Sequence, residues 1–74
     1  MPDRTFTAVV EKEEGGWVAL CPELDVASQG DSVQSALDNL REAVALFLEC
    51  ADPLEVARRT RTDVFVTRFD VPGG

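Results

Sequence analysis

Residues 5–21 read TFTAVVEKEEGGWVALC, and this stretch decides the fold. From Phe6 to Val10 every second residue is apolar, which is the period of a strand with one buried face. Residues 13–16 are Glu-Glu-Gly-Gly, a polar turn whose glycines tolerate positive φ. Another short apolar run follows at residues 17–21. The stretch therefore predicts a β-hairpin.

A long amphipathic helix is predicted downstream. Its apolar residues recur every three or four positions: Val33, Ala36, Leu37, Leu40, Ala43, Val44, Phe47 and Ala51. This stripe should pack against the sheet. Asp31 or Ser32 can cap the N-terminus, and Asp31 with Gln34 has capping-box spacing. Because Pro53 disfavours helical angles in the residue before it, the helix should end near residue 51 or 52.

The remaining segments complete an α+β domain. Residues 26–29 predict a short third strand, and residues 54–61 predict a short connection of about one helical turn. Residues 64–71 alternate again and predict a closing strand. The expected order is β-β-β-α-β, a small antiparallel sheet with one long helix on one face. No repeat or linker divides residues 1–74, so we expect a single domain.

Charge is unevenly distributed along the chain. The net charge is −7 over 74 residues, with twelve acids and three bases in residues 1–57 but two acids and four bases in residues 58–74. An acidic surface repels phosphate, which disfavours direct nucleic-acid binding and predicts a basic protein partner. No apolar run reaches the roughly 18 residues of a membrane span, and no apolar signal segment follows the N-terminus. These features predict a cytoplasmic protein.

Residues suited to catalysis are scarce. The chain has no His and no Tyr, so the usual proton shuttles are missing. Cys21 and Cys50 lie in apolar segments without CxxC spacing, and we interpret both as core thiols. Glu23 and Asp25 could bind a divalent cation, but two carboxylates in an acidic chain are expected by chance. We therefore expect no enzyme activity, no metal and no cofactor.

Several side chains are candidate contact residues, and some of them allow a second interpretation. Trp17 could be a half-exposed interface anchor or a core residue that covers the helix. Leu46 and Leu48 widen the apolar stripe late in the helix and indicate a subunit contact. The arginines at positions 58, 59 and 61 could contact phosphate, but pairing with an acidic surface of this or a neighbouring subunit is the favoured interpretation.

Three segments resemble known proteins. Residues 6–24 (FTAVVEKEEGGWVALCPEL), 28–32 (SQGDS) and 36–43 (ALDNLREA) are similar, in this order, to the opening of HicB-family antitoxins and their stand-alone relatives. The resemblance implies a partial ribonuclease-H-like fold without catalytic residues. It also implies a partner: a small basic mRNA-degrading toxin of the HicA type, shaped like a double-stranded-RNA-binding domain and carrying a catalytic His.

The sequence departs from the family pattern at two places. Many members have a Pro-Gly pair after the Pro-acid-Leu corner, where this chain has residues 25–27, DVA. Complete antitoxins carry a C-terminal DNA-binding segment, and residues up to Gly74 contain none. We therefore expect no separate DNA-binding domain and no autorepression by this chain alone.

The leading hypothesis is a homo-oligomeric binding protein that neutralises such a toxin. Its expected partner-binding residues are Trp17, Glu23, Leu24 and Asp25. Two alternatives remain open: a self-assembling structural or regulatory oligomer without a toxin, and a metal-dependent nuclease suggested by the fold resemblance and the many carboxylates.

Overall fold

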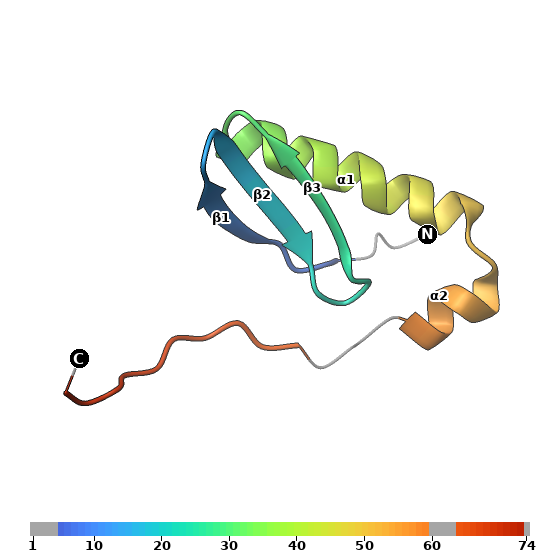
Figure 1. Cartoon of the computed structure of the whole chain (residues 1–74). Helices are drawn as coiled ribbons and strands as arrows, with labels where there is room; N and C mark the ends of the chain where they lie inside the picture. The colour runs from blue at the N-terminus through green and yellow to red at the C-terminus, as the bar shows by residue number, and fades with distance from the viewer. Residues whose placement is uncertain (1–4, 60–63, 74) are drawn as a thin grey trace.

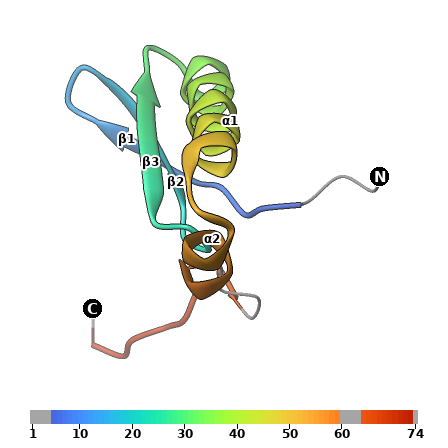
Figure 2. The same cartoon turned by 90° about the vertical axis from the view of Figure 1, so that its right-hand side faces the viewer.

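A computed structural model describes residues 5–59 and 64–73. Its elements, in chain order, are β1 (Val9–Glu13), β2 (Gly16–Cys21), β3 (Val26–Gly30), α1 (Val33–Cys50) and α2 (Pro53–Arg59). The three strands form an open sheet, and α1 covers one face of it (Figures 1 and 2). The expected α+β class is confirmed.

The sheet is antiparallel throughout, in the order β1-β2-β3. Val10 pairs with Ala19, and Ala19 pairs with Ser28 on its other side. The hairpin between β1 and β2 forms as predicted, and Gly15 supplies its positive φ of 88°. Because side chains alternate across a strand, Val10 and Ala19 point to the face that α1 covers.

The core lies between β2 and α1. Its buried cluster consists of Ala19, Cys21, Leu24, Ala36, Leu40 and Val44. Three of these are the central positions of the predicted helical stripe, so the spacing identified the packed face correctly. Burying a side chain the size of leucine contributes about 1.5–3 kcal/mol, so few residues carry much of the stability of this small domain.

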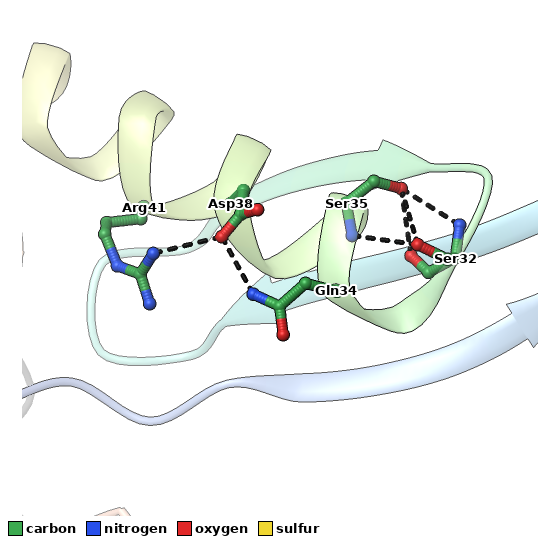
Figure 3. A network of polar contacts seen from close by, with 5 residues as sticks. All are labelled: Ser32, Gln34, Ser35, Asp38 and Arg41. Atoms are coloured by element: carbon green, nitrogen blue, oxygen red, sulfur yellow. Dashed lines mark hydrogen bonds and ion pairs between the residues drawn. The ribbon is translucent and has the colours of Figure 1, made fainter.

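The start of α1 is fixed by a pair of serines (Figure 3). Ser35 donates its backbone N–H to Ser32 Oγ at 3.0 Å, and Ser32 donates its backbone N–H to Ser35 Oγ at 2.9 Å. Ser32 is thus the cap, and the expected pairing of Asp31 with Gln34 is wrong. Gln34 instead donates to Asp38 Oδ1 at 2.9 Å along the helix surface. Because the N-cap is Ser32 rather than Asp31, the capping-box partner three residues later is Ser35 rather than Gln34.

The closing strand of the expected order is not formed. Residues 64–71 are described but pair with no strand among the described residues, and they lie apart from the sheet, below it in Figure 1. The preceding chain forms α2, a longer helix than the single turn expected, whose Val56 is buried. Alternation encodes which side chains share a face, but it does not supply a neighbouring strand.

Candidate functional site

The residues predicted to bind a partner do not form one surface. Trp17 lies near the start of β2, at the hairpin end of the sheet, whereas residues 23–25 follow the end of β2. At about 3.3 Å per residue, the path from Trp17 to Cys21 alone spans about 13 Å. The two groups therefore lie at opposite ends of the sheet (Figure 1).

Leu24 is a core residue rather than a contact residue. Its side chain is 1% exposed and belongs to the cluster beneath α1. The turn after β2 directs this side chain inward, so it is not accessible to a partner in the folded protein. Asp25, next in the chain, is exposed and adopts a positive φ of 58°, a conformation that Asp tolerates better than most residues.

Glu23 connects two segments at this end of the sheet through its side-chain hydrogen bonds. Its Oε2 accepts a hydrogen bond from the Thr7 backbone N–H at 2.8 Å, and its Oε1 accepts one from Cys21 Sγ at 3.6 Å. Burial alone would raise the pKa of Glu23, but the hydrogen bonds from Thr7 and Cys21 favour the charged form and bring the pKa below its ordinary value. Glu23 thus links the residues before β1 to the turn after β2.

The substitution Glu23→Gln should make stability less sensitive to acid. A carboxylate whose pKa is lowered by folding stabilises the protein above its unfolded pKa, about 4.3, and loses that contribution as pH falls through the lower folded value. We expect Glu23→Gln to cost about 1 kcal/mol at pH 7, because the amide accepts a weaker hydrogen bond. The difference from wild type should shrink towards pH 3.

Urea denaturation at pH 7 and pH 3 measures this difference, with Glu14→Gln on the exposed turn as the matched control. A destabilisation by Glu23→Gln that is equally large at both pH values would show that the charge of Glu23 has no part in it.

Trp17 covers the core with part of its side chain, and its role as an interface anchor stays a prediction. Its ring is partly buried and packs against the core, and Lys12 Nζ lies 5.9 Å from the ring centroid. The tryptophan also borders a depression with a volume of about 450 Å³, which we call the hairpin groove. This groove is lined by Glu13, Glu14, Gly15, Gly16, Trp17, Val18, Gln29, Gly30, Asp31, Ser35 and Asn39.

The hairpin groove is acidic. Glu13, Glu14 and Asp31 are exposed, and its lining contains no Lys or Arg among the described residues. Sequence reasoning missed these three carboxylates as a group because the turn at residue 14 and the loop at residue 31 are far apart in the chain. The only sequence signal was the acidic pair beside the tryptophan. Three exposed carboxylates beside an aromatic side chain suit a basic partner, and Lys12 of the chain itself already lies over the ring.

Neither cysteine is placed for catalysis. Cys21 is buried, and burial raises the pKa of its thiol, which keeps it protonated. Cys50 is exposed, so the expectation of a core thiol is wrong there. It is the last residue of α1 and lies off the buried face. Within residues 5–59 and 64–73, no three His, Cys, Asp or Glu side chains are grouped so that they could hold a metal ion.

The two leucines predicted to form a subunit contact differ in exposure. Leu48 is partly buried and packs against the core, whereas Leu46 is 59% exposed. Leu46 borders a second depression of about 530 Å³, which we call the β3 groove. The β3 groove is lined by Ser28, Asn39, Glu42, Ala43, Ala45, Leu46 and Glu49.

Comparison with known proteins identifies relatives along most of the chain. A UPF0150 protein of Helicobacter pylori is 34% identical over 67 residues, which cover 89% of this chain and 93% of the relative. The chain belongs to the UPF0150 family. Two UPF0150 proteins of Synechocystis are each 44% identical: ssl0738 over 56 residues, covering 73% of this chain and 75% of the relative, and ssr1765 over 46 residues.

The match to ssr1765 covers 60% of this chain and 58% of that protein's length. No model of a known protein family matches the chain, and no solved structure matches it. In the described part of the chain, neither helix has the length and apolar character needed to cross a bilayer.

Proposed function

We propose that this UPF0150 protein is a cytoplasmic, non-catalytic binding protein of the HicB antitoxin type, which neutralises a small basic mRNA-degrading toxin by covering its surface. Family membership supports the proposal because UPF0150 proteins are related to HicB-like antitoxins. The resemblance of residues 6–24, 28–32 and 36–43 to those antitoxins supports it further.

The observation that carries the proposal is the hairpin groove. It places three exposed carboxylates around the only tryptophan of the chain. Trp17 offers a large apolar surface of the kind that dominates binding energy, while Glu13, Glu14 and Asp31 attract Lys and Arg. The contact surface proposed here is therefore the hairpin end of the sheet rather than the turn at residues 23–25.

Neutralisation by such a surface requires binding alone and no catalytic step. A ribonuclease binds RNA through basic side chains, so an acidic protein that covers those side chains competes with the phosphate backbone. The negative field of residues 1–57 speeds the encounter, and burial of Trp17 slows dissociation. RNA is excluded from the occupied surface by like charge.

Affinity capture from the native cell extract tests the proposal, with the tagged wild-type chain as bait and the retained proteins identified by mass. We expect a small, basic, His-containing protein. The double substitution Glu13→Lys/Glu14→Lys should reduce its association rate by roughly tenfold or more at low salt, because both charges lie at the contact.

The matched control is Asp38→Lys/Glu55→Lys, which changes the net charge equally on exposed helix surfaces outside the hairpin groove. It should slow association only through the overall field. If both double variants slow association equally, the hairpin groove is not part of the contact surface. If the affinity capture retains only the chain itself, toxin neutralisation is contradicted.

A further inference from the structure

The segment formed by residues 64–71 has the composition of a strand, but no strand lies beside it within residues 5–59 and 64–73. Its sequence is VFVTRFDV, rich in β-branched and aromatic residues, and every second residue from Phe65 to Val71 is apolar or threonine. Phe65 is 88% exposed and Phe69 is 85% exposed, and both valines at positions 66 and 71 are more than 60% exposed. Such exposure of two phenylalanines on one segment marks an interaction site rather than a surface loop.

The segment stands away from the body of the protein. In Figures 1 and 2 it runs as an extended stretch after α2, below the sheet. The radius of gyration is 14.3 Å, compared with about 11 Å for a compact domain of this length. The extents of 46 × 28 × 20 Å show the same elongation.

The sheet offers two edges, and β3 is the unprotected one. Strand β1 carries Glu11, Lys12 and Glu13, and charged side chains discourage pairing at an edge. Strand β3 reads VASQG and has neither a charged residue nor a proline. Asn39 Nδ2 donates to the Gln29 backbone oxygen at 2.7 Å, which holds one end of β3 in place. Among the described residues, no strand pairs with the outer edge of β3.

The β3 groove complements one face of the segment. It presents the exposed Leu46 together with the carboxylates of Glu42 and Glu49. Within the segment, the side chains of Val64, Val66, Arg68 and Asp70 share a face when extended, with Val66 and Arg68 at its centre. A strand laid beside β3 with this face towards α1 brings Val66 to the leucine and Arg68 to the carboxylates.

The opposite face of the segment would continue an apolar surface of the sheet. Phe65 and Phe69 would then extend the sheet face that α1 leaves open, which already carries the half-buried Val18 and Leu20 of β2. Opposite net charges also favour contact between the segment and the body of another copy, because residues 58–74 carry a net charge of +2 and residues 1–57 a net charge of −9.

We propose that residues 64–71 add as a fourth strand to the β3 edge of a second copy of this chain, and that the second copy returns the same contact. The exchange is isologous and closes as a two-fold dimer. Four exposed phenylalanines bury about 600 Å² at roughly 150 Å² each. The remaining side chains of two eight-residue strands bring the total towards the ≈1,200 Å² of a specific interface. This proposal is independent of the toxin.

Sedimentation equilibrium of the full chain, combined with amide hydrogen exchange, tests the proposal. We expect a dimer with slow exchange at residues 64–71. The double substitution Phe65→Ser/Phe69→Ser should weaken dimerisation by roughly 100-fold or more, because two aromatic anchors are lost from each subunit. Its monomer should stay folded and keep the helical circular dichroism signal of the wild type, since both side chains lie outside the core.

The matched control is Leu54→Ser, which removes an apolar side chain that is 71% exposed elsewhere on the surface. It should leave the dimer intact. A wild-type monomer would overturn the proposal, with protected amides at 64–71 indicating pairing with the chain's own β3. A dimer that survives Phe65→Ser/Phe69→Ser would overturn it as well, because the interface would then lie elsewhere.

Discussion

Replacement of Gly30 by alanine should lower the free energy of unfolding by about 3 kcal/mol. A Cβ atom at this position would lie 2.6 Å from the Ala36 backbone nitrogen and 2.7 Å from the Ser35 carbonyl carbon, and would also meet Ser35 Oγ. Two of these atoms are helix backbone, so relief requires α1 to move off the end of β3. A 74-residue domain has about 4–11 kcal/mol of stability in total, so this loss is severe.

Gly15→Ala is the matched control. Gly15 lies in the turn between β1 and β2, at the same end of the sheet as Gly30, and has a positive φ, but a Cβ there meets nothing within 4 Å. Its cost should be about 1–2 kcal/mol, from the backbone conformation alone. Urea denaturation of both variants measures the difference. If Gly30→Ala unfolds no more easily than Gly15→Ala, the close approach of β3 to α1 is not as described.

Leu24→Ala should have a comparable effect, about 3 kcal/mol within the 2–5 kcal/mol range of buried leucine truncations. The side chain is 1% exposed and is one of the two largest that are fully buried, so its removal leaves a cavity under α1. Leu54→Ala, at 71% exposure, is the control and should change the stability by no more than about 0.5 kcal/mol.

This comparison also decides the role of Leu24. If Leu24→Ala kept wild-type stability but lost the partner, the residue would be a contact, as its sequence motif predicted. Loss of stability with binding retained in the remaining folded protein would confirm its place in the core.

The hairpin and the long helix could be predicted from local pattern. A period of two before a Gly-Gly turn and a period of three to four after a capping serine each depend on residues close together in the chain. The buried stripe through Ala36, Leu40 and Val44 followed from the same spacing. In this part of the molecule, short-range rules and tertiary packing agree.

The candidate site could be predicted only in part. Trp17 was identified, but the carboxylates beside it come from a turn and a loop that only the folded sheet brings together. Leu24 looked like part of an exposed corner because a turn sequence does not reveal which side chain points inward. Residues 64–71 were predicted as a strand from their alternation, but that pattern holds no information about whether a partner strand lies in the same chain.

The central claim is that this protein silences a ribonuclease by occupying it, and a titration of RNA cleavage tests it most directly. The basic protein captured from the native extract is incubated with RNA while the full chain is added in increasing amounts. Cleavage should stop near one chain per ribonuclease, and Glu13→Lys/Glu14→Lys should require a clear excess. Cleavage that continues at saturating wild-type chain would contradict the claim, even if the two proteins bind.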